Sequence, residues 1–567
     1  MRHKLNALLL LFVLLLFATA VPAQRKSGSV KPSQANGKRP NIIVILADDM
    51  GFSDVGAYGG EIRTPNLDRL AQRGLRFTQF YNTARCCPSR ASLLTGLYPH
   101  QAGIGHMTDD YAREIRARLN SPAYSTYLND TSVTIAEALR QNGYHTLMSG
   151  KWHVGEERPH HPVDRGFERS FALITGASNY FALPGRWQGT WAIDDQPYTP
   201  PADGSFYSTD AFTDHAVLMV DEYARKDKPF FLYLAYTAPH WPLHAFASDI
   251  AKYRGKYLKG WDAVRAARYR RQLELGIIRR SRQSAPRDER VPAWEEASTL
   301  TAWTQPLNAL PLNAERFGYK PGTYEPTDKQ MWDLKMAIYA AQIDRMDQGI
   351  GRVLAKLKET GAEENTLILF LSDNGAADER IYEGQADAPI GAPASFQSYD
   401  VPWANVSSTP FRLYKHFSHE GGIATPLIAY YPALIKRARL VHQPGHLIDI
   451  MATCLDAAGA EYPRTYKGKK ITPLEGVSLL PLMKGQRYVG RKEIYFEHEG
   501  NRAVRQGRWK SVSRFPGGWQ LYDMETDRTE LTDIASRYPE KVKELAGLYE
   551  AWERRVGVVP WERAVAK

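Results

Sequence analysis

Cysteine is scarce in this chain of 567 residues, which contains only Cys86, Cys87 and Cys454. A protein of this size with three cysteines is not held together by a disulfide framework. Cys86 and Cys87 are adjacent, so their Cα atoms lie about 3.8 Å apart, whereas disulfide-bonded cysteines usually lie about 4.4–6.8 Å apart. A disulfide between them would be strained, and the pair therefore needs another explanation.

Long apolar runs are also scarce, and the one clear example lies at the N-terminus. Residues 8–20 follow a basic start and precede the small residues Val21–Ala23, a pattern typical of a signal peptide (1–23) that is cut after Ala23. A membrane anchor is the alternative, but a spanning helix needs about 20 apolar residues, and no cysteine follows the cut to carry a lipid. We therefore expect an exported protein, periplasmic or secreted and without a stable membrane anchor, in which residues 24–39 form a disordered leader.

Acidic residues are outnumbered by basic ones, and the formal net charge is +11. Most of this excess lies in residues 252–282, where eleven lysines and arginines accompany only two acids, Asp262 and Glu274. The segment is either a rim that attracts an anionic substrate or a solvated helical face, and the second interpretation is favoured. Features that stack on bases or read a groove are missing, so nucleic acid is not an expected partner. No pattern specifies an oligomeric state.

Apolar strands alternate with helices along most of the chain. β-branched and apolar runs predict strands, and segments with helical periodicity predict helices between them. This alternation indicates an α/β sandwich with a large, mostly parallel sheet. The predicted strands are Asn41–Leu46, Leu75–Tyr81, Tyr144–Met148, Pro229–Tyr236 and Thr366–Leu371, and the predicted helices are Asn66–Arg73, Ser132–Gln141, Asp210–Arg225, Met331–Thr360 and Ile448–Ala458.

The pattern changes towards the C-terminus, where short alternating segments predict an antiparallel sheet and a helix. We expect a catalytic domain over residues 40–460 and a smaller C-terminal α+β subdomain over residues 461–567. Residues 245–326 lack strand signals and are expected to form an insertion or lid on the substrate side. The C-terminal strands are predicted at Glu493–Glu497, Arg502–Arg505 and Trp509–Val512, and the helix at Leu545–Arg554.

Polar side chains follow four of the predicted strands. In open α/β sheets, ligands bind outside the carboxyl ends of the strands, and four such groups in one chain indicate a single assembled site. Lys151 and His153 are two residues apart, so an extended segment would point both to one side. The residues concerned are Asp48 and Asp49, Lys151 and His153, His240, and Asp373 and Asn374.

The stretch Cys86–Gly96 combines two cysteines, a proline and an arginine with a terminal glycine. Pro88 and Gly96 predict a short helix that starts near Cys86. The N-terminus of a helix stabilises a thiolate, and Arg90, one turn further on, can face the same point. The alternative is a buried structural cysteine beside a surface arginine.

This stretch is similar to the signature of the type I sulfatases, C-x-P-S-R followed by T-G, at every defining position. The resemblance implies an alkaline-phosphatase-like fold and the conversion of Cys86 to formylglycine (3-oxoalanine) by a maturation enzyme. It also implies that Pro88, Ser89 and Arg90 direct this conversion and that Arg90 later holds the hydrated aldehyde. Residues 260–294 resemble the insertion of bacterial arylsulfatases.

Asp48, Asp49, Asp373 and Asn374 offer only oxygen atoms, a donor set that suits calcium or magnesium rather than zinc. Helix capping or turn formation would explain either pair alone. The resemblance assigns all four as metal ligands, with the modified residue 86 completing the set. Calcium is favoured over magnesium because several protein oxygens converge.

Three further segments resemble blocks of the same family. Residues 150–155 are similar to G-K-W-H-L-G, with valine for leucine, which implies catalytic roles for Lys151 and His153. Residues 238–243 place His240 on the sulfate, and Lys415 matches the last catalytic lysine of the family. His244, His416 and His419 are expected to be structural or to support the residues that contact substrate.

The resemblance implies hydrolysis of an organic sulfate ester to an alcohol or phenol and inorganic sulfate. The hydrated aldehyde at position 86 would supply the nucleophile next to calcium, with Lys151, Lys415 and Arg90 supplying positive charge. His240 and Lys415 would assist the leaving oxygen, and His153 would remove a proton to restore the aldehyde. The substrate would be a small or saccharide sulfate ester. The alternatives are a phosphomonoester or phosphonate hydrolase of the same superfamily and a non-catalytic binder of sulfated glycans.

Overall fold

The computed structural model describes residues 38–109, 112–185, 187–201, 203–278, 283–297, 329–384 and 388–566. The predicted signal peptide, nearly all of the predicted leader and part of the predicted insertion lie outside these residues.

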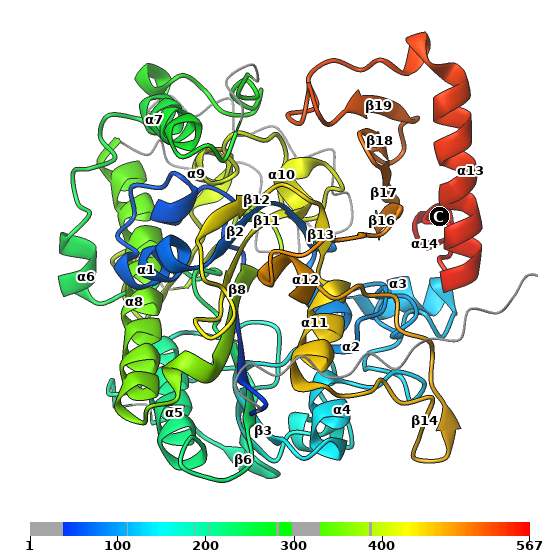
Figure 1. Cartoon of the computed structure of the whole chain (residues 1–567). Helices are drawn as coiled ribbons and strands as arrows, with labels where there is room; N and C mark the ends of the chain where they lie inside the picture. Colours follow the sequence, from blue (N-terminus) through cyan, green and yellow to red (C-terminus); the bar gives the residue numbers. More distant parts are fainter. Residues whose placement is uncertain are drawn as a thin grey trace, which may run out of the picture. The chain divides into compact units, whose positions relative to one another are not determined.

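A large mixed sheet forms the centre of the fold (Figure 1). Strand β1 lies between β7 and β8, parallel to both, and β3 and β4 continue the parallel array. Strands β11 and β5 run in the opposite direction to their neighbours β8 and β4. In spatial order the strands are β12 (Arg439–Val441), β2 (Leu75–Tyr81), β11 (Ala424–Tyr430), β8 (Thr366–Ser372), β1 (Asn41–Ala47), β7 (Phe230–Ala235), β3 (His145–Lys151), β4 (Arg169–Leu173), β5 (Trp191–Ile193) and β6 (Gln196–Tyr198), and β13 (Gly445–His446) pairs with β2.

The central strands are apolar on both faces because the sheet is covered on both sides. In β1, Ile43 and Ile45 enter one hydrophobic core, whereas Ile42 and Val44 enter another. Strands buried on both faces read as continuous apolar runs rather than alternating ones. This explains why the runs in the sequence identified the strands, and the predicted α/β class with a mostly parallel sheet is confirmed.

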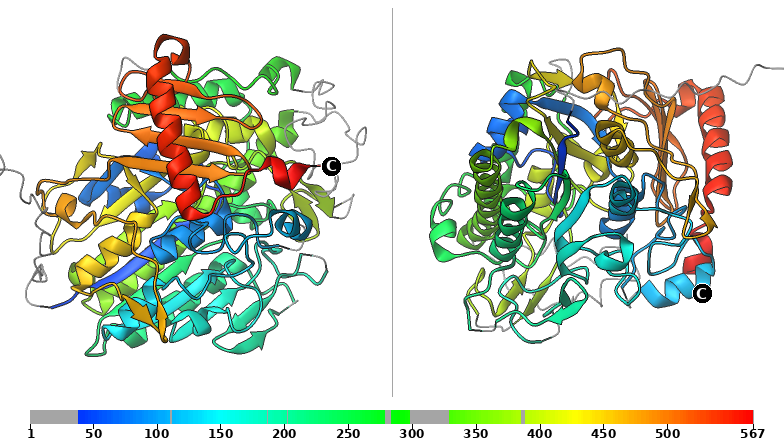
Figure 2. Two further views of the ribbon diagram at one scale, coloured as in Figure 1. Left: turned by 90° about the vertical axis from the view of Figure 1, so that its right-hand side faces the viewer. Right: turned by 60° about the horizontal axis from the view of Figure 1, so that its bottom comes forward.

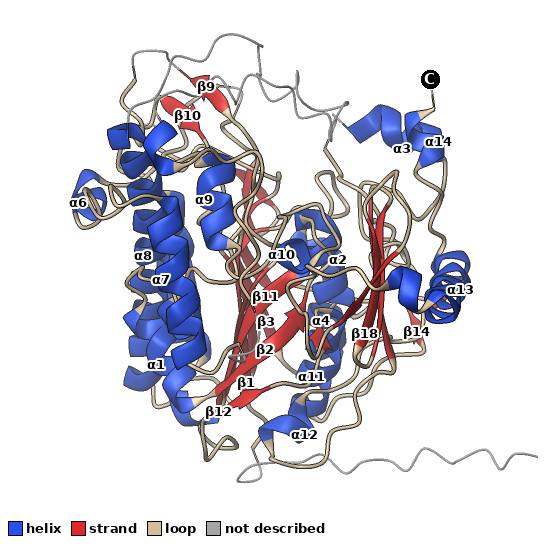
Figure 3. Ribbon diagram, turned by 90° about the horizontal axis from the view of Figure 1, so that it is seen from above, coloured by secondary structure: helices blue, strands red, loops and turns tan. Residues whose placement is uncertain are grey.

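Helices form a layer on each side of the sheet (Figure 3). On one side, α8 packs against α1 and α5; on the other side, α11 packs against α2 and α4. Among the described residues, no helix combines the length and the apolar character that a membrane span requires. The helices of the first layer are α1 (Pro65–Arg73), α5 (Ser208–Tyr223) and α8 (Lys329–Glu359), and those of the second are α2 (Cys86–Thr95), α4 (Ile135–Gln141) and α11 (Ile448–Ala458).

A second, antiparallel sheet lies near the C-terminus, as expected from the change of pattern there. Helix α13 lies across its strands (red over orange in Figure 2), and Val504, Leu521, Leu545 and Trp552 form the core between them. The strands are β16 (Glu493–His498), β17 (Asn501–Gln506), β18 (Trp509–Ser513) and β19 (Gln520–Asp523), and the helix α13 spans Pro539–Val556.

Apart from α7, which has 14 residues, the remaining elements are short. They are the helices α3 (Arg113–Leu119), α6 (Ala247–Ala251), α7 (Trp261–Glu274), α9 (Asp400–Ser407), α10 (Glu420–Ile423), α12 (Leu480–Met483) and α14 (Glu562–Val565), and the strand pairs β9 (Tyr382–Gly384) with β10 (Ser395–Gln397) and β14 (Thr465–Tyr466) with β15 (Lys469–Lys470).

Several predicted boundaries differ from the structure, the largest difference being the start of α13 at Pro539 instead of Leu545, and two others are informative. Helix α4 begins at Ile135 instead of Ser132, because the Thr134 side chain accepts a hydrogen bond from the Glu137 amide and caps the helix there. Strand β3 continues to Lys151 instead of ending at Met148. The extension places Lys151 on the sheet itself rather than on a following loop.

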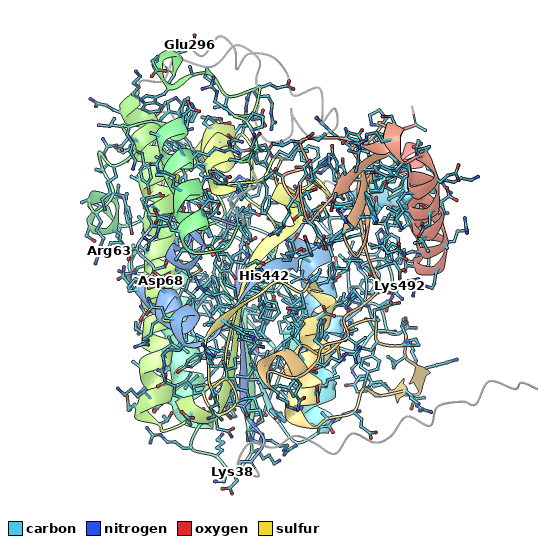
Figure 4. All side chains as sticks on the ribbon, turned by 45° about the horizontal axis from the view of Figure 1, so that its top comes forward. Lys38, Arg63, Asp68, Glu296, His442 and Lys492 are labelled. Atoms are coloured by element: carbon cyan, nitrogen blue, oxygen red, sulfur yellow. The ribbon has the colours of Figure 1, made fainter. Side chains whose placement is uncertain are left out.

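The basic segment is only partly a solvated face. Arg270 and Arg271 on α7 are exposed, but Arg265 and Arg268 on the same helix are buried. The Arg268 guanidinium lies 2.6 Å from an Asp54 carboxylate oxygen and 2.8 Å from a Glu61 carboxylate oxygen. The expectation of a solvated face is therefore wrong for these two arginines, since a repeating pattern of basic residues does not reveal acids elsewhere in the chain. By contrast, Lys38, Glu296 and Lys492 lie at the periphery (Figure 4).

Replacing Arg268 by alanine is expected to lower the free energy of unfolding by about 3–5 kcal/mol, because it leaves two carboxylates without their cation inside the fold. Urea denaturation followed by tryptophan fluorescence measures the loss. Arg271→Ala, on the exposed side of the same helix, is the matched control and should change stability by less than about 0.5 kcal/mol. Equal urea midpoints for the two variants would show that the buried pairs do not stabilise the fold.

Candidate active site

The carboxyl ends of β1 and β8 bring four oxygen-bearing residues together. Ala47 and Ser372 are paired in register, so the residues that follow each strand lie side by side. The Asp49 amide donates to Asp373 Oδ1 at 3.2 Å, and the Asn374 amide group donates to Asp49 Oδ1 at 2.6 Å. Asp48, Asp49, Asp373 and Asn374 are all buried, at most 2% exposed.

Cys86 reaches the same point from helix α2. The helix begins at Cys86 and ends at Thr95, and the following Gly96 has a φ of +68°, the left-handed conformation that glycine adopts readily. The Cys86 Sγ atom is 4.0 Å from Asp49 Oδ1, and the residue is 1% exposed. The helix predicted from Pro88 and Gly96 therefore places residue 86 directly beside the carboxylates.

The Cys86 thiol is not the stabilised thiolate that its place at a helix N-terminus suggests. Burial raises its pKa far above the usual range, and this effect outweighs the opposing charges of Lys415 and Lys151. Asp48 and Asp49 raise the pKa further. The thiol is therefore protonated at neutral pH and is a poor nucleophile as it stands.

Two cations neutralise the inner carboxylates. The Arg90 guanidinium lies 2.8 Å from Asp373 Oδ2 and 3.5 Å from Asp48 Oδ2. The Lys151 ammonium lies 2.6 Å from Asp48 Oδ2, and its charge holds the pKa of Asp48 well below the usual range despite the opposing effect of burial. Burial and the Asp48 charge raise the pKa of Asp373 to about 7.

Lys415 is the third cation, and it is held by a residue that the sequence did not reveal. Its ammonium lies 2.9 Å from Asp49 and 3.3 Å from Glu379 Oε2. Glu379 also accepts from Trp241 Nε1 at 2.6 Å and lies 3.1 Å from Arg85. Glu379 lies in a loop without periodicity, so only its position after Asp373–Gly375 pointed towards the site.

His240 lies against the metal-ligand candidates. Its Nε2 is 3.4 Å from Asp49 Oδ2, while its Nδ1 is 2.6 Å from the Trp241 carbonyl oxygen. Since a carbonyl only accepts, Nδ1 carries the proton and Nε2 faces the site. Burial lowers the pKa of His240, although Asp49 partly opposes this.

His153 pairs with a carboxylate outside the oxygen-bearing set. Its Nε2 is 3.4 Å from the carboxylate of Asp109, another residue that the sequence did not single out. Burial lowers the pKa of His153 to about 4, so the imidazole is neutral at pH 7.

The backbone around Lys151 and His153 is not the extended segment that the alternation suggested. Strand β3 ends at Lys151, and His153 has a φ of +56°, which is not an extended conformation. Just before Lys151, a Cβ atom at Gly150 would lie 1.9 Å from the Ala235 carbonyl oxygen. Glycine is needed there so that β3 can approach β7 closely enough for Lys151 to reach Asp48.

The other three histidines considered for support are engaged elsewhere. His244 Nε2 lies 2.6 Å from the Ser395 carbonyl oxygen, and burial lowers the pKa of His244 to about 4. His419 is buried next to helix α10. His416 Nδ1 lies 3.1 Å from Glu499 Oε2, outside the oxygen-bearing set.

The oxygen-bearing residues fit a hard divalent cation. Among the described residues, Asp48 Oδ1 and Asn374 Oδ1 are buried and have no hydrogen-bond partner. Burying an oxygen atom without a hydrogen-bond partner costs free energy, because the atom gives up its hydration. A cation bound between these two oxygens would offset that cost. Carboxylate and amide oxygens are the donors that calcium prefers.

Fold and site together define the class. A mostly parallel sheet carries, at its carboxyl edge, a buried group of oxygen donors, a buried cysteine and three fixed cations, which is an arrangement for hydrolysing an ester of an anionic oxyacid. The sulfatase family model matches residues 40–460, and a model described as N-sulphoglucosamine sulphohydrolase, C-terminal, matches residues 411–547. The chain belongs to the sulfatase family, and it is a hydrolase of sulfate esters with the alkaline-phosphatase-like fold of that family.

Similar proteins support this assignment. The chain is 34% identical over 478 residues to an arylsulfatase of Klebsiella aerogenes, covering 81% of this chain and 95% of that protein. It is 33% identical over 566 residues to an uncharacterized sulfatase of Schizosaccharomyces pombe, covering 93% and 95%. The mouse steryl-sulfatase is 28% identical over 496 residues, covering 85% and 71%.

Solved structures share the fold. Ps i-CgsB, solved in complex with k-i-k-neocarrahexaose, aligns with a TM-score of 0.64 and 23% identity, covering 94% of this chain and all of that one. BT4656, solved in complex with its substrate D-glucosamine-2-N, 6-O-disulfate, aligns with a TM-score of 0.60 and 23% identity, covering 93% and 100%.

Glu379→Gln is expected to reduce kcat/KM for a sulfate ester by about 10–100-fold, because it removes one of the two carboxylates that position the Lys415 ammonium. Steady-state kinetics with an aryl sulfate measures the loss. Glu359→Gln, which alters an exposed acid at the end of α8, is the control and should change kcat/KM less than about twofold. If both variants keep full activity, Glu379 does not position Lys415 for the reaction.

Proposed function

We propose that the chain hydrolyses its sulfate ester with a formylglycine at position 86 and one calcium ion. The observation that carries this proposal is that Cys86 lies beside four oxygen-bearing residues. These residues follow β1 and β8, which are far apart in the sequence but adjacent in the sheet. The raised pKa of the unmodified thiol supports it further, because the cysteine as encoded is not an effective nucleophile.

Asp48, Asp49, Asp373 and Asn374 would hold calcium together with the modified residue 86. When both groups are in place, the hydrated aldehyde supplies a hydroxyl nucleophile whose pKa calcium lowers. Arg90, which lies between Asp48 and Asp373, keeps the carboxylates oriented towards this point.

Lys151 and Lys415 provide the charge that a sulfate ester requires. The ester carries one negative charge, and charge builds up on the leaving oxygen as the S–O bond breaks. Both ammonium groups are buried, 0% and 3% exposed, so water screens them little and their attraction for an anion is strong. Glu379 prevents Lys415 from turning entirely towards Asp49.

The two histidines suit different proton transfers. His153 is neutral at pH 7 because burial lowers its pKa to about 4, so it can accept a proton from a hydroxyl at position 86. The Nε2 of His240 faces Asp49, whose carboxylate stabilises a proton on that nitrogen. In its doubly protonated form, with Nδ1 held by the Trp241 carbonyl, His240 would pass the proton on Nε2 to the leaving oxygen.

We further propose a saccharide or aryl sulfate as the substrate. Trp241, adjacent to His240, packs against Trp187 with ring centroids 5.4 Å apart, and Phe396 lies 5.8 Å from Trp241. Such an aromatic group next to the site suits the apolar face of a sugar or an aromatic ring. The names of the relatives, which include an arylsulfatase and N-acetylgalactosamine-6-sulfatases, are consistent with either class.

The two alternatives from the sequence are less well supported. A phosphomonoesterase with two metals would need further histidine and aspartate ligands next to the first set, and the family match favours sulfate. A non-catalytic glycan binder would have no need of the buried Lys151 and Lys415 pairs. Arg268, in the basic segment proposed for glycan binding, is already neutralised by Asp54 and Glu61.

Export and maturation are part of the proposal. The N-terminal pattern of residues 1–23 supports transfer to the periplasm or the medium. The motif from Cys86 to Arg90 supports recognition by an enzyme that generates formylglycine. The three cysteines of the chain are free and buried, so none of them forms a disulfide in this fold.

Mass spectrometry of the tryptic peptide Cys86–Arg90 from active protein should detect an aldehyde or its hydrate at position 86 instead of a thiol. Cys86→Ala should lower kcat by at least about 1000-fold without unfolding the chain, because the nucleophile is lost. Cys87→Ala is the matched control, since Cys87 Sγ faces the His106 carbonyl and Met107 rather than the carboxylates. Fully active enzyme with an unmodified thiol at position 86 would exclude formylglycine.

Removal of divalent metal should lower activity by at least about tenfold, and calcium should restore it more completely than magnesium, because the site offers several convergent protein oxygens. Activity is measured after chelation and gel filtration, with residual calcium determined by mass spectrometry. Asn374→Ala should raise the calcium concentration needed for half-maximal activity. Full activity at less than about a tenth of an equivalent of metal would remove calcium from the mechanism.

A further inference from the structure

A second group of potential metal ligands lies where the C-terminal sheet meets the main fold. His498 ends β16 and Glu499 forms the turn to β17, with a φ of +51°. His416 comes from the loop that follows the catalytic Lys415, and His106 comes from the loop between α2 and α3. We call these four residues the His–Glu cluster. None of them belongs to the oxygen-bearing set at the ends of β1 and β8.

Three members have the spacing of ligands around one small ion. His416 Nδ1 is 3.1 Å from Glu499 Oε2, and His498 Nε2 is 3.6 Å from Glu499 Oε1. One donor atom from each residue lies within 4.8 Å of the others. Ligand atoms around a tetrahedral zinc ion, with bonds of about 2.1 Å, lie about 3.4 Å apart. The observed separations bracket this value.

His498 is buried without a hydrogen-bond partner. It is 0% exposed, and among the described residues neither of its ring nitrogens has a hydrogen-bond partner. Its Nε2 points at Glu499, but 3.6 Å is too long for a hydrogen bond. A buried imidazole without a hydrogen-bond partner costs free energy, unless an ion between His498 and Glu499 binds its nitrogen.

The charges of the cluster favour metal binding. Burial lowers the pKa of both His416 and His498, so the imidazoles tend to be neutral. The histidines hold the pKa of Glu499 well below its usual range even though burial opposes this. In the described part of the chain, Glu499 forms its ion pairs with histidines. Neutral imidazoles and an ionised carboxylate are the forms that bind metal.

Neighbouring groups fix the orientation of these ligands. The Asn501 side chain lies 3.1 Å from His416 Nε2, the nitrogen that faces away from Glu499. His106 Nε2 is 2.7 Å from Glu499 Oε1, and the His106 ring stacks on that of His498 with centroids 5.7 Å apart. Outer contacts of this kind orient the ligands of protein metal sites.

We propose that His416, His498 and Glu499 bind a divalent first-row transition metal ion, with zinc the best match, as a second metal site. Two imidazoles and one carboxylate suit zinc, whereas calcium prefers oxygen ligands alone. The ion would join the β16–β17 turn to the segment that carries Lys415. The proposal does not depend on formylglycine or on calcium at the first site.

Metal analysis of the whole protein tests this. Protein stripped by chelation is dialysed against zinc with calcium in excess, so that calcium occupies the oxygen-bearing site, and bound zinc is measured by mass spectrometry. We expect one zinc per wild-type chain and at least a tenfold loss of bound zinc in His498→Gln and Glu499→Gln. His100→Gln is the matched control, because His100 is a buried histidine that pairs with Glu497 outside the ligand set, and it should retain zinc.

Two further measurements need only the wild-type chain, so they remain decisive if a variant fails to fold. Cobalt added in place of zinc should produce the visible absorption of a tetrahedral site, and zinc should raise the melting temperature of calcium-saturated protein. Absence of stoichiometric zinc together with an unchanged melting temperature would overturn the proposal. Equal zinc binding by wild type and both ligand variants would also overturn it.

Discussion

The charge balance at the carboxyl edge of the large sheet is the constraint on which the rest of the site depends. Three buried carboxylates, those of Asp48, Asp49 and Asp373, each face a cation there. The partner of Asp48 is Lys151, that of Asp49 is Lys415 and that of Asp373 is Arg90. Buried charges of one sign are costly unless they are paired. Each cation comes from a different element, so α2, β3 and the loop before α10 are all tied to the ends of β1 and β8. The fold and the chemistry therefore rest on the same contacts.

Much of this arrangement could be predicted because the governing rules are local. Continuous apolar runs identify strands covered on both faces, and polar residues after such strands collect at one edge of a parallel sheet. This reasoning pointed to Asp48, Asp49, Asp373 and Asn374, and the structure brings them together. A side chain at position 150 would collide with the Ala235 carbonyl oxygen on the neighbouring strand. The sequence around residue 150 does not show this contact.

The errors have a common cause, which is that local patterns omit burial and distant partners. The helix N-terminus suggested a stabilised thiolate at Cys86, but burial and two adjacent carboxylates reverse the effect. The basic helix α7 was expected to face water, but Asp54 and Glu61 bind Arg268 inside the fold. No periodic pattern predicted Glu379, since its role depends on how one loop reaches Lys415. The His–Glu cluster unites loops that are separated by hundreds of residues.

The depth of helix α2 has a consequence for how the enzyme is made. All residues from Cys86 to Thr95 are buried, and Arg90 is pinned by a guanidinium–carboxylate pair and by the Lys151 carbonyl. If a maturation enzyme oxidises residue 86, as proposed, it would have to bind this stretch before the chain folds. The relative rates of folding and modification would then decide the yield of active enzyme, because residue 86 is buried in a chain that folds first and can no longer be modified.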